Sequence, residues 1–317
     1  MYSPLPQQYA CLMYTEPGDN KHGNAMAGDR RKITDAVMEA VVRFSGITTI
    51  VFVVLIFVLL LRNGLPVFRY TSVPKFLFGR DWLPLSGVFG ILPLILGSLL
   101  VTAGAVVIAV PLGVAVAVYI AEVAPPRVKE FLKPIVETLA AIPSVVIGFI
   151  GLLVLAPVVQ RVFDLPTGLT AFTGSVMLAL MALPTITSIA EDAITAVPRD
   201  YRAASLALGA TRWQTIRMAV VPAARSGIFA GAMLGIGRVI GETMAVLMVT
   251  GNAAVVPTTI FEPVRTMTAT IAAEMGETVQ YSPHYFALFA IGLVLFVITF
   301  AINLLADLAL RRSTASR

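Results

Sequence analysis

Residues 44–61 read FSGITTIVFVVLIFVLLL, and none of them carries a charge. A helix needs roughly 20 consecutive apolar residues to cross a bilayer, so this run is long enough for one span. Comparable runs follow at about 88–120, 134–159, 169–190, 227–249 and 285–310. The sequence therefore predicts an all-α integral membrane protein with about six transmembrane helices.

The overall composition supports this class. Of the 317 residues, 57% are hydrophobic and only 13% are charged, whereas an average soluble domain carries about 25% charged residues. The formal charge of +5 could suggest nucleic acid, but in a membrane protein it more often reflects orientation signals. We expect lipid contacts and no nucleic acid partner.

Prolines interrupt several of the apolar runs. The run 88–120 is long for one span and contains Pro93 and Pro111, which predicts a tilted or broken helix. Pro143 and Pro184 are predicted to kink their helices and to free backbone carbonyls that line a cavity. A kink that serves only packing explains these two prolines equally well.

The distribution of basic residues predicts the sidedness. With the N-terminus inside, the inner segments hold 16 of the lysines and arginines and the outer segments hold 6. The positive-inside rule then places both termini in the cytoplasm. Residues 1–40 are predicted to be a cytoplasmic, largely disordered tail, because their first 32 residues are polar and rich in proline.

Few residues are suited to covalent chemistry. The chain has one cysteine, Cys11, and two distant histidines, His22 and His284, so no cluster predicts a metal site. No Gly-x-x-x-x-Gly-Lys segment is present to cradle the phosphates of a nucleotide. We expect a protein that is not an enzyme and that binds no cofactor itself.

A polar segment at about 191–225 separates two of the spans. Residues 203–208 favour a helix, Gly209 permits a left-handed turn, and a second amphipathic helix is expected from Thr211 to Val221, closed by Pro222. Such a helix–glycine–helix element would form a compact knob on the cytoplasmic face, suited to a groove on a partner protein.

At these residues the sequence resembles the permease subunits of ABC importers, whose coupling loop reads Glu-Ala-Ala, three residues, Gly and, about a dozen residues later, Leu-Pro. The matching residues are Ala203, Ala204, Ser205, Gly209 and Val221-Pro222. Ala203 stands where the family usually has glutamate, which weakens any expectation of a salt bridge there. The resemblance implies that this loop docks on a separate ATPase and transmits its closure as rigid-body motion, with Arg202, Arg212 and Arg217 available for acidic residues of that partner.

Three further stretches, residues 137–148, 182–186 and 235–246, resemble the phosphate permeases of the Pst system, more like PstC than PstA. The resemblance runs from about residue 40 to the C-terminus. It implies a type I ABC importer permease domain over residues 41–317, which carries inorganic phosphate across the plasma (inner) membrane. The implied partners are PstB-like ATPase subunits that bind Mg-ATP, a PstA-like second permease and a PstS-like extracytoplasmic phosphate-binding protein.

Arg238 and Glu242 are charged residues inside a glycine-rich span. Helical spacing of four residues would place them on one face within reach of an ion pair. A guanidinium matches phosphate oxygens, and the carboxylate could hold it until an anion arrives. An Arg–Glu pair that only joins helices is the alternative. Glu137 is either part of the same substrate path or an interfacial residue in the first turn of its helix.

The sequence is also compatible with three other functions. A permease for molybdate or sulfate is one, although the residues around Arg238 resemble phosphate permeases. An ion-coupled secondary transporter should show internal repeats, and we find no convincing one. A membrane scaffold is a third.

Residues 266–277 are expected to form a short amphipathic helix on the outer surface, which either receives a binding protein or caps the pore.

Overall fold

The computed structural model describes the backbone of residues 21–315 and the side chains of residues 38–308. The chain divides into two compact units, Met1–Val58 and Leu59–Arg317. Helix α1 (Lys21–Gly64) provides the described residues of the first unit. Its apolar side chains between Met38 and Leu59 are exposed, as expected of residues that face lipid.

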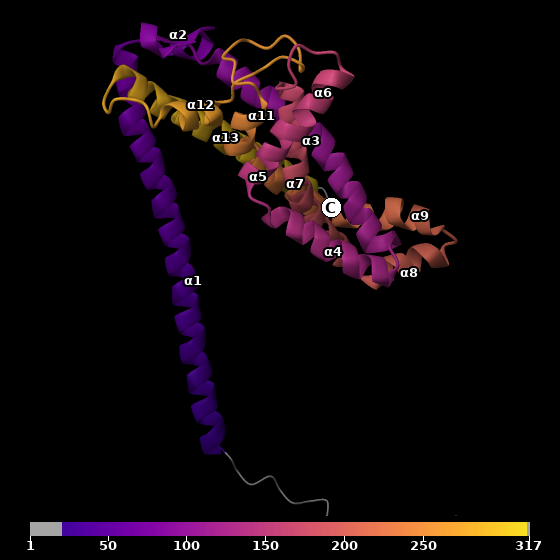
Figure 1. The fold of residues 1–317 in the computed structure, drawn as a ribbon. Coiled ribbons are helices and arrows are strands. Elements are labelled where there is room, and N and C mark those ends of the chain that lie inside the picture. Colours follow the sequence, from indigo (N-terminus) through magenta and orange to yellow (C-terminus); the bar gives the residue numbers. More distant parts are fainter. Residues whose placement is uncertain (1–20, 316–317) are drawn as a thin grey trace, which may run out of the picture. The chain divides into compact units, whose positions relative to one another are not determined.

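The second unit is almost entirely helical (Figure 1). Its α-helices are α2 (Val73–Phe78), α3 (Leu92–Val118), α4 (Pro126–Ala141), α5 (Ser144–Ile150), α6 (Ala156–Val162), α7 (Ala171–Thr195), α8 (Arg199–Ala207), α9 (Arg212–Thr215), α10 (Val221–Ile240), α11 (Met244–Val249), α12 (Met267–Glu274) and α13 (Pro283–Ala315). Short 3-10 helices are η2 (Leu65–Arg69) and η3 (Pro84–Ser86), and π-helical turns are η4 (Tyr119–Val123), η5 (Gly151–Leu155) and η6 (Ile216–Val220). Strands β1 (Trp82–Leu83) and β2 (Val88–Phe89) pair antiparallel, with Trp82 opposite Phe89.

Six helices of the described residues are long and apolar enough to cross a membrane, which confirms the predicted number. They cover Met38–Arg69, Leu92–Val123, Ser144–Val162, Ala171–Thr195, Arg212–Ile240 and Pro283–Leu308. The second span is continuous through Pro111 and widens only at its π-helical end, so it is not broken as the prolines suggested.

Helix α7 is the most buried of the six spans and lies between α3 and α10. Glycines on both neighbours let these helices approach it closely. A Cβ atom on Gly113 of α3 would lie 2.8 Å from Cγ2 of Ile186, and one on Gly235 of α10 would lie 2.5 Å from Cγ1 of the same residue. In the glycine-rich span that holds Arg238, Gly235 is thus a position where only a hydrogen in place of a side chain lets α7 come this close.

Two predicted segments differ from the structure. Helix α1 begins at Lys21, so residues 21–40 of the predicted disordered tail are helical, while residues 1–20 lie outside the described residues. Residues 266–274 do form a helix, α12, but its first residues, Met267 to Thr270, are buried. This end of α12 enters the bundle instead of lying on its surface.

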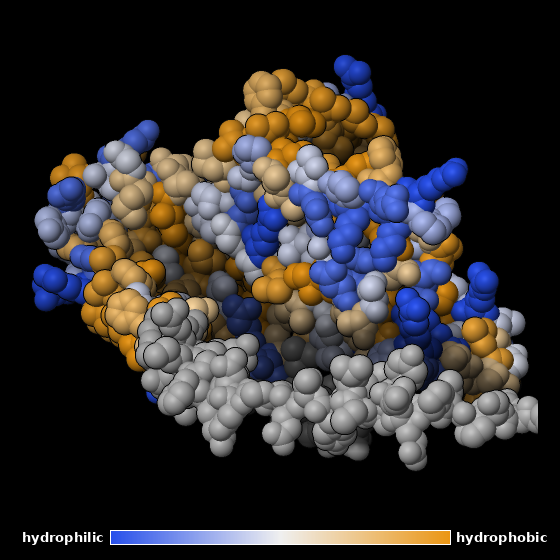
Figure 2. Space-filling model, turned by 90° about the horizontal axis from the view of Figure 1, so that it is seen from below, coloured by the Kyte–Doolittle hydropathy of each residue, from blue (hydrophilic) through white to orange (hydrophobic). Residues whose placement is uncertain are grey.

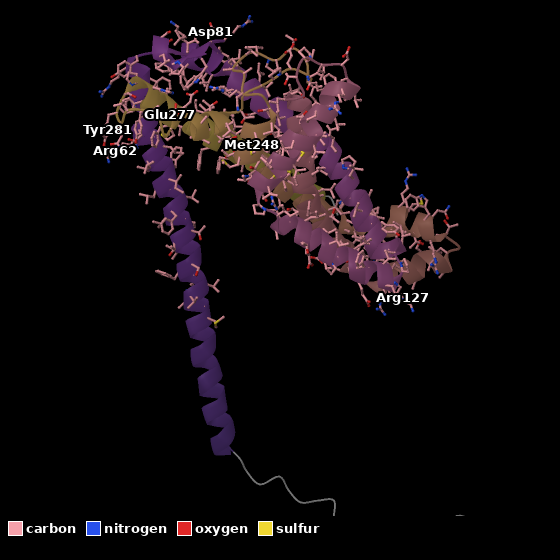
Figure 3. The ribbon with its side chains drawn as sticks, in the orientation of Figure 1. Arg62, Asp81, Arg127, Met248, Glu277 and Tyr281 are labelled. Atoms are coloured by element: carbon pink, nitrogen blue, oxygen red, sulfur yellow. The ribbon has the colours of Figure 1, made fainter. Side chains whose placement is uncertain are left out.

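Polar side chains mark the two ends of the spans. Arg127 lies at the end of the bundle that carries α8, and Asp81 lies at the opposite end (Figure 3). Viewed from below, a group of hydrophilic residues is surrounded by apolar ones (Figure 2). This distribution is the one expected of a helix bundle that is belted by lipid and wet at both ends.

Candidate functional site

Arg238 lies in the last turn of α10 and reaches two neighbouring helices. Its guanidinium donates to Thr185 Oγ1 at 3.2 Å and to the carbonyl oxygen of Ala140 at 3.3 Å. Thr185 follows Pro184 near the middle of α7, so the guanidinium lies about halfway along that span, at a half-buried position. Three elements that are distant in the sequence therefore meet at this side chain.

The carbonyl of Ala140 is free for Arg238 because of Pro143. In a continuous helix this carbonyl would accept from the amide four residues on. Here α4 ends at Ala141, and Ile142 and Pro143 are extended before α5 starts at Ser144. The predicted effect of Pro143, a freed carbonyl, is confirmed, although the helix is interrupted by two extended residues instead of kinked. Pro184 lies inside α7 without ending it.

Glu242 does not pair with Arg238, and the predicted ion pair is wrong. Helix α10 ends at Ile240, so the helical spacing on which the prediction depended stops before Glu242 is reached. The Glu242 carboxylate instead accepts from the backbone N–H of Ala245 at 3.2 Å, in the first turn of α11. Residues 241–243 form the link between α10 and α11, which we call the α10–α11 link.

Arg238 is consequently a cation without a counter-charge inside a membrane span. Among the ion pairs of the described residues, none includes Arg238 or Glu242. A charged residue at the centre of a span costs about 2.5–3.5 kcal/mol on insertion scales, and its neighbours here are neutral acceptors. An anion that reached this guanidinium would find the fork of N–H donors that phosphate and carboxylate groups bind.

The α10–α11 link is partly accessible: Gly241 is exposed, and Glu242 and Thr243 are half-buried. Beside it lies a small cavity of about 10 Å³, which is lined by Ser98, Thr102, Glu242, Thr266 and Thr268, among others. That volume is about the minimum for a single water molecule and far below what a tetrahedral oxyanion needs. This cavity is therefore too small to hold phosphate in the described structure.

Glu137 lies apart from Arg238, in a narrow crevice between α4 and α7. The crevice is also lined by Lys133, Thr187 and Glu191. No hydrogen bond or ion pair of the described residues joins Glu137 to Arg238 or Glu242. The structure thus brings together Arg238, Thr185 and Ala140. Glu137 lies near the C-terminal end of α4, three residues before Ala140, so it is not in the first turn of its helix, and its carboxylate lines the crevice instead of meeting Arg238.

A buried carboxylate that the sequence did not reveal ties α4 to α7. Glu191, whose side chain is 3% exposed, pairs with Lys129 at 3.0 Å and with Lys133 at 2.8 Å. Lys133 also pairs with Asp192 at 3.1 Å. Glu191 and Asp192 accept these hydrogen bonds and raise the pKa of Lys133 far above the usual range of a lysine, so it remains protonated at physiological pH.

The predicted left-handed turn at Gly209 is confirmed. Helix α8 ends before Gly209, whose φ of +83° is left-handed. Thr211 then caps α9, accepting from the N–H of Gln214 at 3.3 Å while the Gln214 side chain accepts from the N–H of Thr211 at 2.8 Å. Ser205 Oγ and Thr215 Oγ1, 3.0 Å apart, join the two helices. We call residues 199–215 the coupling knob.

Two expectations for this region need correction. Pro222 does not close the second helix: the widened π turn η6 precedes it, and the span continues through it to Ile240. Arg202 does not extend towards a partner, because it is ion-paired with Glu122 and donates to the carbonyl of Val197 at 2.6 Å. Arg212 and Arg217 remain exposed.

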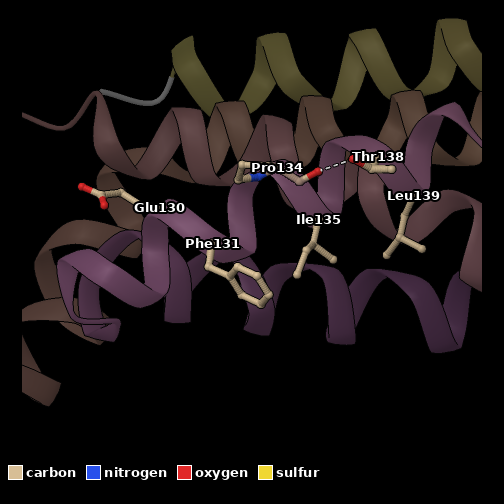
Figure 4. Close-up of a pocket in the computed structure, with 6 residues that line it drawn as sticks. All are labelled: Glu130, Phe131, Pro134, Ile135, Thr138 and Leu139. Atoms are coloured by element: carbon tan, nitrogen blue, oxygen red, sulfur yellow. Dashed lines mark hydrogen bonds between the residues drawn. The ribbon is translucent and has the colours of Figure 1, made fainter.

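The surface of the knob is unusually apolar, and a second apolar surface lies on α4. Leu208 is 89% exposed and Trp213 is 63% exposed. Along α4, Phe131, Ile135 and Leu139 recur every four residues and line a shallow groove of about 310 Å³ (Figure 4). They lie on the face of α4 opposite to Lys129 and Lys133.

Comparisons with known proteins agree with this architecture. Residues 109–314 match the family model of the binding-protein-dependent transport system inner membrane component. A probable ABC transporter permease protein of Bacillus subtilis, YqgH, is 43% identical over 77% of this chain and 80% of its own length. The phosphate transport system permease proteins PstC of Mesorhizobium japonicum and Haemophilus influenzae are 36% and 33% identical, over 90% and 84% of this chain and 93% and 91% of theirs.

Solved structures share the fold at low sequence identity. The MetNI methionine ABC transporter in an inward-facing conformation aligns over 74% of this chain and 99% of its own, with a TM-score of 0.55 and 17% identity. A bacterial ABC transporter that imports the acidic polysaccharide alginate aligns over 81% and 95%, with a TM-score of 0.54 and 16% identity. The second unit therefore has the type I ABC importer permease fold that the sequence predicted.

Proposed function

Because the chain belongs to the family of binding-protein-dependent transport system inner membrane components, we propose that it forms the channel of an ATP-driven importer of inorganic phosphate. The PstC-named relatives, which match nearly the whole chain, support the substrate. The single observation that carries the proposal is the guanidinium of Arg238, which has no ion-pair partner among the described residues and lies beside the middle of α7.

The neighbours of Arg238 favour hydrogen phosphate over sulfate. Arg238 contacts a carbonyl oxygen, that of Ala140, and a carbonyl can only accept a hydrogen bond. Hydrogen phosphate carries a P–OH group that can donate to this oxygen, whereas sulfate is fully deprotonated and would meet a repulsive lone pair. The Ala140 carbonyl has a second lone pair beside the one that accepts from Arg238, so a ligand that can donate to it is favoured over one that can only accept.

We place the knob in the cytoplasm, together with both termini of the chain, in the plasma membrane. ATP and Mg²⁺ would bind to a separate ATPase, since the sequence holds no phosphate loop of its own. The exposed Leu208 and Trp213 would enter a groove of that subunit. The rigid turn at Gly209 would then carry ATPase closure through α9 and η6 into α10, which holds Arg238.

Two further partners complete the proposed importer. The apolar ridge Phe131, Ile135 and Leu139 on α4 is suited to a second permease subunit. The segments at the α12 end of the bundle would face outward and receive a phosphate-binding protein.

Reconstitution tests this proposal. The chain would be co-purified with its ATPase and second permease, placed in proteoliposomes, and supplied with the binding protein and radiolabelled phosphate. We expect ATP-dependent accumulation that unlabelled phosphate abolishes and an excess of sulfate or molybdate does not. Accumulation that sulfate or molybdate abolishes would instead support a permease for another oxyanion, and accumulation without ATP would support a secondary transporter.

A further inference from the structure

Helix α12 forms hydrogen bonds at both of its ends. One end contacts the α10–α11 link near Arg238, and the other contacts β1 and α13. It has eight residues, Met267–Glu274, which corresponds to a length of about 12 Å. Thr266 caps its first turn, accepting from the N–H of Ala269 at 3.2 Å. A capped single helix of this length moves as a rigid rod.

The buried end of α12 holds the α10–α11 link. Thr268 Oγ1 donates to the backbone carbonyl of Glu242 at 2.8 Å, and Thr268 is only 8% exposed. Thr266 Oγ1 lies 3.1 Å from Thr268 Oγ1, and the N–H of Met267 donates to Ser98 Oγ of α3 at 2.9 Å. Ser98, Thr266 and Thr268 line the cavity of about 10 Å³ beside Glu242, so this end of α12 fills most of the space there.

The other end of α12 carries a charged cluster. The carboxylate of Glu274 accepts from Arg265 Nη1 at 2.6 Å and from Trp82 Nε1 at 3.1 Å, and lies 2.7 Å from His284 Nε2. Trp82 belongs to β1 and His284 to the first turn of α13. A displacement of these two segments is therefore passed to α12 through two contacts on one carboxylate, while Arg265, which directly precedes the cap of α12, makes the third.

We propose that Thr268 is a positioning residue for Glu242 and that α12 transmits movement from the Glu274 cluster to the substrate path. The inference rests on the proposed function. The hydrogen bond from Thr268 fixes the carbonyl of Glu242 and thereby the orientation of the backbone at this residue. That orientation in turn positions the Glu242 carboxylate, which accepts from the first turn of α11. When α12 shifts, the link that follows Arg238 is released and the small cavity beside Glu242 widens.

The test is uptake by the full complex in proteoliposomes, expressed per assembled complex. Thr268→Val keeps the shape of the side chain but removes the donor, and it leaves the carbonyl of Glu242 unsatisfied. We expect the maximal rate to fall about tenfold, with little change in the phosphate concentration at half-maximal rate. Thr268→Ser restores the hydroxyl and should restore most of the rate.

Thr270→Val is the matched control. Thr270 is fully buried on the same helix, and its hydroxyl donates at 2.8 Å to Thr266 O, within α12's own first turn. The two substitutions are chemically identical, yet only Thr268 touches the link. Thr270→Val should transport within about twofold of the unmodified complex, since it loses one local hydrogen bond.

Equal rates for Thr268→Val and Thr270→Val would overturn the inference, as would failure of Thr268→Ser to recover. If Thr268→Val does not assemble, Thr268→Ala, which adds no bulk, decides in the same assay with the same expected loss. Failure of the unmodified complex to accumulate phosphate would instead refute the proposed function. The two failures are therefore distinguished by the first measurement of the series.

Discussion

The coupling knob and the α10–α11 link are both places where a helix stops beside a glycine, yet they are held in different ways. At Gly209 the φ angle is +83°, and the following helix is capped by Thr211 and Gln214 from within the same turn. At Gly241 the φ angle is −84°, an ordinary helical value. The link is held from outside by Thr268 of α12 and by its own Glu242 side chain.

This difference separates a transmitting element from an adjustable one. A turn fixed by its own residues keeps its shape when a partner moves it, which suits a knob that passes on a rigid-body displacement. A link fixed by a contact from another helix changes when that helix moves. The break that is held by its own residues is thus the knob, where we propose that the ATPase docks, and the break that is held by another helix lies beside Arg238.

Gly209→Val should have the larger effect of the two glycine substitutions. A left-handed conformation costs roughly 1–2 kcal/mol for an L-residue, and more for a β-branched one. We expect insertion of the spans to persist while ATP-dependent uptake falls at least about tenfold, the factor to which 1.4 kcal/mol corresponds. Uptake and co-purification of the ATPase would be measured on the same preparation.

Gly209→Asn is the control, because asparagine tolerates the left-handed region far better than valine. It should retain most of the uptake. Normal uptake in Gly209→Val, with the ATPase still bound, would show that the knob does not need this turn.

Gly241→Ala should have the smaller effect. Its φ is negative, and an added Cβ would lie 3.7 Å from the nearest atom outside its immediate neighbours, the carbonyl oxygen of Gly237. Uptake per assembled complex should stay within about twofold of the original, because alanine fits here without strain. A loss as large as that of Gly209→Val would mean that the link needs the freedom of glycine, and the contrast between the two breaks would disappear.

The sequence predicted most of what local rules determine. The six spans follow from apolar runs, and the left-handed turn at Gly209 follows from a glycine between two helix-forming segments. The freed carbonyl at Ala140 could be predicted from Pro143, but its hydrogen-bond partner, Arg238, could not. The resemblance to ABC importer permeases was confirmed. It rested on the segment around Gly209 and on residues 137–148, 182–186 and 235–246.

What the sequence missed depends on contacts between distant residues. The Arg238–Glu242 pair was inferred from helical spacing, but α10 stops at Ile240, and Thr268, 26 positions beyond Glu242, holds the link. Glu191, near the end of α7, and Lys133, in the middle of α4, are 58 positions apart. No local pattern relates two residues so far apart, so their pairing could only be seen in the fold.

The most direct test of the central claim, that Arg238 is the phosphate contact in the path, is uptake per assembled complex in Arg238→Gln. Glutamine keeps much of the side-chain volume and can still donate to Thr185 or Ala140, but it removes the charge and the guanidinium fork. We predict that this variant assembles normally and loses phosphate uptake, while Arg238→Lys, which keeps the charge alone, falls in between. Near-normal uptake by assembled Arg238→Gln complexes would contradict the account, because Arg238 would then only join α10 to α4 and α7.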